Sequence, residues 1–156
     1  MRILAATLAL TLLADQASKW AVIDRMALAQ RLYVEIWPPY LNFTMAWNTG
    51  INFGLFGGGT DATRWILIAL ALAICTWVLV WTWRERANRM MQLAAGLLVG
   101  GALGNVIDRL RYGAVADFIN MSCCGINNPY AFNIADVAIF AGAGLLILFA
   151  GRKNTP

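Results

Sequence analysis

Four long apolar runs constrain the fold of this chain more than any other feature of its sequence. They lie at about residues 3–23, 65–83, 90–109 and 134–151, and each is long enough to cross a ~30 Å hydrocarbon core as a helix. Of the 156 residues, 60% are hydrophobic and 13% are charged. This composition excludes an ordinary soluble domain and predicts a single integral membrane domain over residues 1–156.

The segment between the first two runs, about residues 31–57, has a different periodicity. Apolar residues alternate with their neighbours from Leu32 to Ile36, again from Leu41 to Trp47, and from Ile51 to Leu55. Turn residues such as Pro38-Pro39 separate these stretches. A period of two interrupted by turns predicts short β-strands. We therefore expect four transmembrane helices and a small β-sheet outside them, lying on the membrane surface.

Arginines in one short loop indicate the orientation in the membrane. Arg84, Arg86 and Arg89 lie between the second and third runs, whereas the other cationic residues are divided between the two sides. These arginines predict that both termini are cytoplasmic and that the sheet lies outside. The first run also has features of a secretory signal peptide. However, Asp15 and Lys19 interrupt it and three further runs follow, which argues against cleavage.

The composition also excludes several kinds of site. Histidine is absent and the three cysteines form no CxxC pair, so we expect no zinc site and no Cys–His nucleophile. The net charge of +4 does not indicate a nucleic-acid partner, because the Lys and Arg residues flank apolar runs. Cys123 and Cys124 are neighbours that bridge with difficulty, and we interpret them as a detail of a loop.

Acidic residues between the third and fourth runs are the strongest candidates for chemistry. Charged groups at the edge of a bilayer are costly and are functional candidates by default. One loop joins Asp117 to Asp136, so both lie near the same membrane face, and Gly113 allows the chain to turn back. Two close carboxylates do not readily ionise together, so one can deprotonate a water while the other protonates the carbonyl or leaving amine. Such a pair could hydrolyse a peptide bond without a metal or a covalent nucleophile.

Other interpretations of these acids remain open at this point. They could cap helices or pair with arginines, and paired acids also serve proton-coupled transport. A transporter predicts carboxylates deep within the spans and often internal repeats, whereas these acids cluster at one face and no repeat is evident. A structural membrane subunit would use the glycine stripe of Gly96, Gly100 and Gly104 as an interface, although such stripes mainly serve packing.

Asp15 and Lys19 form a further candidate pair at the end of the first run. They are four residues apart, so they share one helical face and can form an ion pair. The pair could be a simple salt bridge at a helix end, or it could hold the rim of a site. The spacing alone does not distinguish these two roles.

Five short blocks with polar residues at set positions cover nearly the whole chain. They are Asp15-Gln16 with Lys19, Asn48-Thr49-Gly50 with Phe53-Gly54, Gly100-Gly101-Ala102-Leu103-Gly104-Asn105 with Asp108-Arg109, Gly113-x-Val115-x-Asp117-Phe118, and Phe132-Asn133-x-Ala135-Asp136. In this order they resemble the blocks of the lipoprotein signal peptidases, also called signal peptidase II. The resemblance implies an aspartic endopeptidase, a hydrolase of lipoprotein maturation, in the bacterial cytoplasmic (inner) membrane.

The resemblance also implies roles for individual residues. Asp117 and Asp136 correspond to the catalytic pair. The residues that line or shape the site are Asn48, Gly50, Asn105, Arg109 and Asn133, and those that support it are Asp15, Lys19, Gly101 and Asp108. We hypothesise that Asn105 and Asn133 position the scissile carbonyl or the aspartates. Arg109 is interpreted as an anchor for loop carbonyls or for Asp108.

Substrate and partners follow from the same resemblance. The substrate it implies is a prolipoprotein that already carries diacylglycerol on a cysteine, cut just before that cysteine. The small sheet corresponds to the β-cradle of the family, on the outer membrane surface. Membrane lipids and globomycin-type cyclic peptide inhibitors are the other implied partners. We expect a monomer that uses no cofactor.

Overall fold

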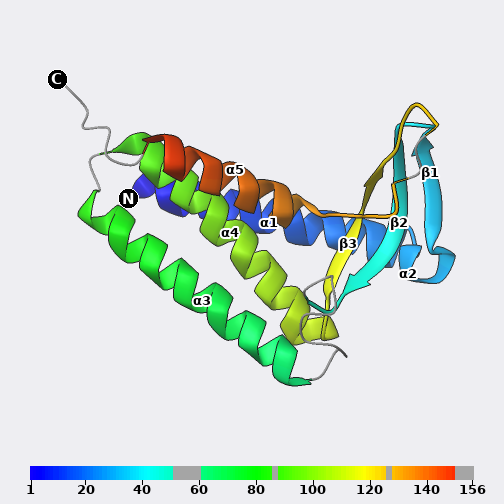
Figure 1. Ribbon diagram of the computed structural model, residues 1–156, viewed down its shortest axis with the longest axis horizontal. Coiled ribbons are helices and arrows are strands. Elements are labelled where there is room, and N and C mark those ends of the chain that lie inside the picture. The colour runs from blue at the N-terminus through cyan, green and yellow to red at the C-terminus, as the bar shows by residue number, and fades with distance from the viewer. Residues whose placement is uncertain (51–60, 86–87, 126–127, 150–156) are drawn as a thin grey trace.

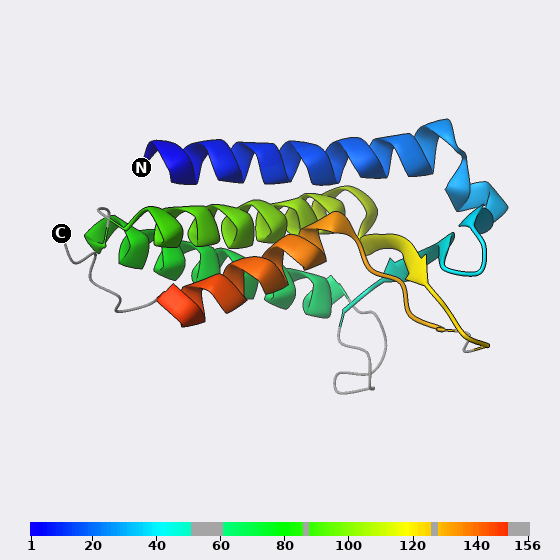
Figure 2. The same cartoon turned by 90° about the horizontal axis from the view of Figure 1, so that it is seen from above.

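A bundle of four long helices with a small sheet across one end makes up the computed structural model (Figure 1). The structure describes residues 1–50, 61–85, 88–125 and 128–149. The long helices are α1 (Arg2–Lys19), α3 (Asp61–Arg84), α4 (Arg89–Tyr112) and α5 (Ile134–Phe149). Met1 and the C-terminal end of α5 lie at the end of the bundle away from the sheet (Figure 2).

Helix α4 is the centre of the bundle and packs against α1, α3 and α5. The Asn88 side chain caps its start by accepting from the Met91 N–H at 3.1 Å. A Cβ on Gly96 would lie 2.7 Å from Thr7 Cβ, and one on Gly100 would lie 2.8 Å from the Leu8 carbonyl oxygen. The glycine stripe therefore serves the close packing of α4 against α1.

The apolar core of the bundle lies around α4. Its buried members come from all four long helices. They are Leu4, Cys75, Val78, Met91, Ala94, Ala95, Leu98, Val99, Ala102 and Leu146. Helix α3 contributes few of them, because many of its large apolar side chains point outward, for example Trp65, Ile66, Leu70 and Trp77.

Two helices of the described chain, α3 and α4, are long and apolar enough to cross a membrane. Helix α5 is apolar but has 16 residues. Helix α1 has 18 residues, among them Arg2, Asp15 and Lys19, and charged groups of this kind are costly in a hydrocarbon core. The four predicted long helices are thus present in the predicted order. Only two of them, α3 and α4, have the length and composition of a membrane span.

The sheet is antiparallel, with strand order β1-β2-β3. The prediction placed strands in residues 31–57, where β1 (Tyr33–Trp37) and β2 (Leu41–Asn48) are found. The third strand, β3 (Val115–Met121), follows α4 and pairs with β2. It was not predicted, because its sequence lacks a strict alternation of apolar and polar residues. The alternating stretch from Ile51 to Leu55 lies outside the described residues.

An irregular end of the first helix joins the sheet to the bundle. Helix α1 continues as a π-helical turn, η1 (Trp20–Arg25), and then as the short α2 (Leu28–Arg31). Val22 and Leu28 form a second apolar cluster with Phe118 of β3. Phe43 of β2 packs edge-on against Phe118, with ring centroids 5.4 Å apart. The contacts of Phe118 with Val22 and Leu28 fix the sheet against the segment that follows α1.

Candidate active site

Asp117 lies in β3, close to the end of the helix bundle. Helix α4 ends at Gly113, whose φ of 79° is left-handed, as expected for a turn that leads straight into a strand. Asp117 is only 4% exposed. Its Oδ1 accepts from Asn133 Nδ2 at 2.6 Å and its Oδ2 accepts from Asn48 Nδ2 at 3.1 Å. The pairing of β2 with β3 brings Asn48 to this position.

Asp136 lies in the first turn of α5. Its Oδ1 accepts from Asn105 Nδ2 at 2.9 Å, and its Oδ2 accepts from the backbone N–H of Asn133 at 3.2 Å. In return, Asn133 Oδ1 accepts from the backbone N–H of Asp136 at 2.9 Å. This reciprocal pair is a capping box, which satisfies two N–H groups at the helix start. The cap therefore fixes the side chain of Asp136 relative to the α5 axis.

Asn133 links the two aspartates. It is fully buried, and its Nδ2 lies within hydrogen-bond distance of Asp117 Oδ1, the Ala116 carbonyl and Asn105 Oδ1. The backbone N–H of the same residue donates to Asp136 Oδ2, so Asn133 contacts one carboxylate with its side chain and the other with its backbone. Burial and the negative charge of Asp136 raise the pKa of Asp117 from 3.8 to about 6, although hydrogen bonds from Asn48 and Asn133 oppose the shift.

A buried ion cluster lies beside these aspartates. The Lys19 ammonium is 2.9 Å from Asp15 Oδ2 and 2.6 Å from Asp108 Oδ2. It also donates to Asn105 Oδ1 at 3.4 Å. Gln16 Nε2 donates to both carboxylates at 3.1 Å. The predicted Asp15–Lys19 pair is thus present, and its contacts with α4 make it part of the site's framework.

The cluster also holds the backbone next to each candidate catalytic residue. Asp108 Oδ2 accepts from the Ala116 N–H at 3.1 Å, and Asp15 Oδ1 accepts from the Ala135 N–H at 3.0 Å. Ala116 precedes Asp117, and Ala135 precedes Asp136. One ion cluster therefore fixes β3 and the start of α5 relative to each other.

The remaining predicted residues lie around this core. Gly50 donates its N–H to Asn48 Oδ1 at 3.1 Å, which orients the amide that contacts Asp117. A Cβ on Gly101 would lie 2.5 Å from the Ala135 carbonyl oxygen, so only glycine lets α4 approach α5 this closely. Arg109 donates to the Asn105 carbonyl at 3.4 Å. Of the two anchors considered for Arg109, the described hydrogen bond is to a carbonyl, and Asp108 is bound by Lys19 and Gln16.

Two features of the site were missed by sequence reasoning. Gln16 was not among the predicted site residues, although a glutamine next to Asp15 in an apolar run is an unusual polar residue. The capping box of Asn133 and Asp136 has a recognisable spacing before an apolar run. No group of three or more His, Cys, Asp or Glu side chains that could hold a metal occurs among the described residues.

Comparison with known proteins identifies the family. The model of the family described as signal peptidase (SPase) II matches residues 7–151. A lipoprotein signal peptidase of Methylocella silvestris is 42% identical over 147 residues, covering 92% of this chain and 84% of the relative. One of Rhizorhabdus wittichii is 39% identical, covering 95% and 85%. The chain belongs to the signal peptidase II family.

Solved structures agree with this assignment. A bacterial membrane enzyme solved by the in meso method at 1.9 Å resolution has a TM-score of 0.79 and 30% identity, over 99% of this chain and 96% of the other. The family consists of aspartic endopeptidases of the bacterial inner membrane. Family membership therefore favours hydrolysis over the transporter and the structural subunit.

Proposed function

We propose that this protein removes the signal peptide from diacylglyceryl-modified prolipoproteins and that Asp117 and Asp136 perform the hydrolysis. The observation that carries the proposal is Asn133, which contacts one carboxylate with its side chain and caps the helix that bears the other. Two carboxylates held together in a partly buried site can share one proton at neutral pH. A shared proton is what a metal-free aspartic hydrolase requires.

The surroundings of the two carboxyl groups suggest a role for each aspartate. The pKa of Asp117, raised to about 6, suits a residue that donates a proton in the reaction. Asp136 accepts two N–H hydrogen bonds at the positive end of α5, an arrangement that suits a carboxylate. In our proposal Asp136 takes a proton from water as the water oxygen attacks the scissile carbonyl carbon, while Asp117 protonates the carbonyl oxygen. The C–N bond then breaks and the leaving nitrogen takes a proton from the dyad.

An apolar groove beside the dyad supports access from the bilayer. It has a volume of about 230 Å³ and lies between α3, α4 and α5. Leu67, Leu70 and Ile139 are among its lining residues, and its polar end is formed by Asn105 and Arg109. Asn105 in turn donates to Asp136. A lipidated substrate could therefore enter sideways and place its scissile bond at the aspartates without leaving the membrane.

We also propose that all four long helices span the membrane, with both termini cytoplasmic and the sheet forming the β-cradle on the outer surface. Exposed tryptophans support this, because Trp20 and Trp65 lie at the sheet end of the bundle and Trp77 and Trp83 lie towards the other end. The test uses a membrane-impermeant maleimide on spheroplasts. Cys123 and Cys124 should react, whereas Glu85→Cys in a Cys123→Ser/Cys124→Ser background should react only after permeabilisation.

The activity is tested with purified protein in lipid, using a diacylglyceryl-modified prolipoprotein and its unlipidated twin. We expect cleavage of the lipidated form alone, just before the modified cysteine, as shown by mass spectrometry of the products. We further propose that the protein acts as a monomer and that a globomycin-type cyclic peptide competes with the substrate. Equal cleavage of the unlipidated twin would contradict the proposed substrate class.

A further inference from the structure

A second cavity lies where helix α3 begins and where helix α4 and strand β2 end (Figure 1). Its volume is about 490 Å³, within the usual range of ligand sites. Two charged groups and two aromatic rings are among its lining residues, which include Trp47, Thr49, Asp61, Arg64 and Tyr112. None of its described lining residues also lines the apolar groove.

The cavity lies on the other side of β2 from the dyad. Asn48 directs its amide to Asp117 at 3.1 Å, and Trp47 is the residue before it in the strand. Successive side chains of a strand point to opposite faces, so Trp47 points away from Asp117. It packs instead against Tyr112 at the end of α4, with ring centroids 5.2 Å apart. The cavity therefore calls for a ligand other than the peptide bond that is cut.

The cavity also lies at the edge of a membrane span. Helix α3 is long and apolar enough to cross a membrane. Its 24 residues cover about 36 Å at 1.5 Å per residue, slightly more than a ~30 Å hydrocarbon core. Asp61 and Arg64 are in its first turn, so their charges lie at the level of the lipid headgroups whichever way the helix is oriented. The exposed Trp65 follows them, as is typical of this interface.

Arg64 presents a fixed cation to the cavity. Its Nη2 donates to the Leu110 carbonyl at 3.0 Å, near the negative end of α4. Its Nη1 lies 4.0 Å from the place that a Cβ on Gly113, another lining residue, would take. Among the described residues this Nη1 is neither buried nor hydrogen-bonded. A guanidinium that is held at one edge and free at the other suits the oxygens of a phosphate group.

Asp61 places a carboxylate close to this guanidinium. Residues three apart on a helix have Cβ atoms about 5–6 Å apart. Asp61 is nevertheless exposed, and within the described part of the chain no ion pair joins it to Arg64. Both charges are therefore available to a ligand that carries both signs. The rings of Trp47 and Tyr112 in the same cavity add faces that attract an ammonium group.

The apolar surface of α3 indicates that this ligand is a lipid. Trp65 and Leu72 follow Asp61 after four and eleven residues, so they continue its face of the helix. They are 54% and 44% exposed. A lipid whose headgroup occupies the cavity can lay its acyl chains along this face, whereas a water-soluble phosphate compound would leave the face uncovered.

We propose that this cavity binds the headgroup of a zwitterionic phospholipid. The phosphate lies on Arg64, the ammonium group lies between Asp61 and the rings of Trp47 and Tyr112, and the acyl chains follow α3. Such a lipid holds the start of α3 against α4 and β2. The site is separate from the hydrolysis and does not rest on the proposed function.

Native mass spectrometry of the purified protein in detergent tests the headgroup. Apparent Kd values for the first bound lipid are measured with phosphatidylethanolamine, which has both charges, and with phosphatidylglycerol of the same acyl chains, which has the phosphate alone. We expect the wild-type protein to bind phosphatidylethanolamine about fivefold more tightly. Asp61→Asn should bind the two lipids equally. Arg64→Gln should bind both about tenfold more weakly, because it removes the cation that holds the phosphate.

The control is Arg84→Gln, which removes the same charge at an exposed residue at the other end of α3. It should leave both Kd values unchanged. An unchanged preference in Asp61→Asn would overturn the site, and since Asp61 is exposed this result stands even if Arg64→Gln fails to fold. Soluble glycerophosphoethanolamine should bind far more weakly than the lipid. Equal binding of the soluble compound would overturn a lipid as the occupant.

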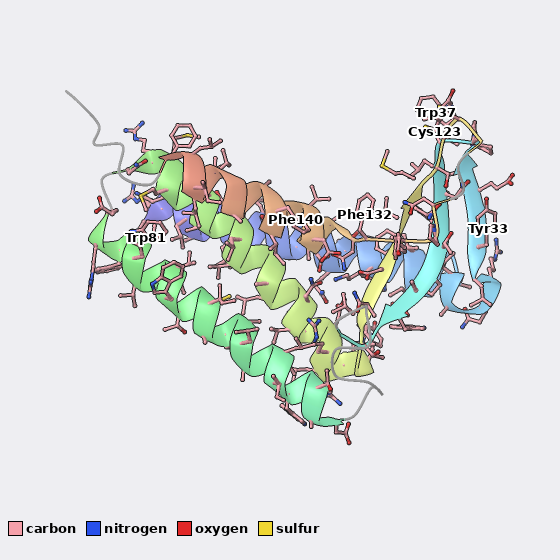
Figure 3. All side chains as sticks on the ribbon, viewed as in Figure 1. Tyr33, Trp37, Trp81, Cys123, Phe132 and Phe140 are labelled. Carbon is pink, nitrogen blue, oxygen red and sulfur yellow. The ribbon has the colours of Figure 1, made fainter. Side chains whose placement is uncertain are left out.

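Photocrosslinking in a membrane locates the bound lipid. The photoreactive amino acid p-benzoylphenylalanine replaces Thr49, an exposed lining residue, in vesicles with equal amounts of the two lipids. The control position is the exposed Trp83, two residues from Trp81, which Figure 3 shows at the end of the bundle away from the sheet. Adducts of phosphatidylethanolamine should predominate at Thr49, whereas the two lipids should be labelled equally at Trp83. The same lipid ratio at both positions would overturn the site.

Discussion

The protein has two pairs of buried or half-buried aspartates within one site, and they differ in their partners. Asp15 and Asp108 share the ammonium group of Lys19 at 2.9 and 2.6 Å. Asp117 and Asp136 have no such cation among their described hydrogen bonds and ion pairs, and their side-chain partners are the amides of Asn48, Asn105 and Asn133. The same residue type is therefore fixed by charge in one pair and held by neutral donors in the other.

This difference teaches which pair can do chemistry. A carboxylate paired with a buried lysine is a structural element, because moving its proton would leave the lysine charge uncompensated. A carboxylate held by amides can gain or lose a proton while its hydrogen-bond geometry is retained. The first pair holds the backbone next to each member of the second through Ala116 and Ala135. Structure and chemistry are thus divided between neighbouring aspartates.

The largest expected effect is on the rate of cleavage. Asp117→Asn and Asp136→Asn should each lower kcat by about 10³-fold or more, because each removes a group that carries a proton in the reaction. The protein should still fold, since asparagine has nearly the same shape and its one oxygen keeps one of the two hydrogen bonds that each carboxylate accepts. Single-turnover cleavage measured per folded molecule checks this. Residual activity within tenfold of the wild type in a folded variant would refute the assignment.

The next largest effect is on folding. Lys19→Met should destabilise the protein by about 3–5 kcal/mol, because it leaves Asp15 and Asp108 buried without their cation. The expected result is a much lower thermal midpoint in detergent and a low yield of folded protein. Glu85→Gln, at an exposed residue, is the matched removal of one charge and should change little. A stable Lys19→Met protein with wild-type activity would show that the ion cluster is dispensable.

A smaller effect on stability, with the opposite sign to that of Lys19→Met, is expected when Asp117 is replaced. Its pKa is about 6 in the folded protein, against an ordinary value of 3.8, so the folded state binds more protons between these pH values. Stability therefore falls as pH rises from about 4 to about 6, and the full cost remains above pH 6. Asp117→Asn should be more stable than the wild type at pH 8 by about 3 kcal/mol. This advantage should vanish below pH 4.

Thermal midpoints of both proteins across this pH range provide the measurement. Asp108→Asn is the matched comparison, because it makes the same chemical change in the lysine-bound pair and should lower the midpoint at pH 8. If Asp117→Asn, like Asp108→Asn, is less stable than the wild type at pH 8, the two aspartate pairs do not differ in the way proposed.

The smallest effect concerns the packing that brings the pairs together. Gly101→Ala would push a methyl group against the Ala135 carbonyl at 2.5 Å, next to Asp136. Overpacking of this kind costs about 1–3 kcal/mol, and we expect a modest loss of both stability and kcat. Gly144→Ala meets nothing within 4 Å and should be neutral. If the two variants have the same stability and the same kcat, the close α4–α5 contact at Gly101 is not needed for catalysis.

Much of this arrangement could be predicted from the sequence, because polar residues in apolar runs are conspicuous. The four helices, β1 and β2, and the positions of Asp117 and Asp136 at one end of the bundle follow from periodicity and from the single loop between the two aspartates. The close packing role of Gly96, Gly100 and Gly104 also follows from their spacing. The predicted ion pair of Asp15 with Lys19 is present.

The rest depends on contacts between distant segments. β3 forms because β2 offers a free edge, and its own residues from Val115 to Met121 do not alternate. The ion-pair partner of Asp108 is Lys19, from a different helix, and the spacing of the sequence did not predict this contact. Which aspartates are bound by lysine and which by amides is decided by such tertiary contacts, and residue type and spacing do not encode them directly.

The central claim is that the Asp117–Asp136 pair holds a titratable proton that the chemistry uses. Infrared difference spectroscopy of the purified protein, labelled with ¹³C at the aspartate carboxyl groups, tests it most directly. We predict a protonated-carboxyl band that titrates near pH 6, disappears in Asp117→Asn and persists in Asp108→Asn. A band that survives in Asp117→Asn, or one that is absent from the wild type between pH 4 and 8, would contradict the account.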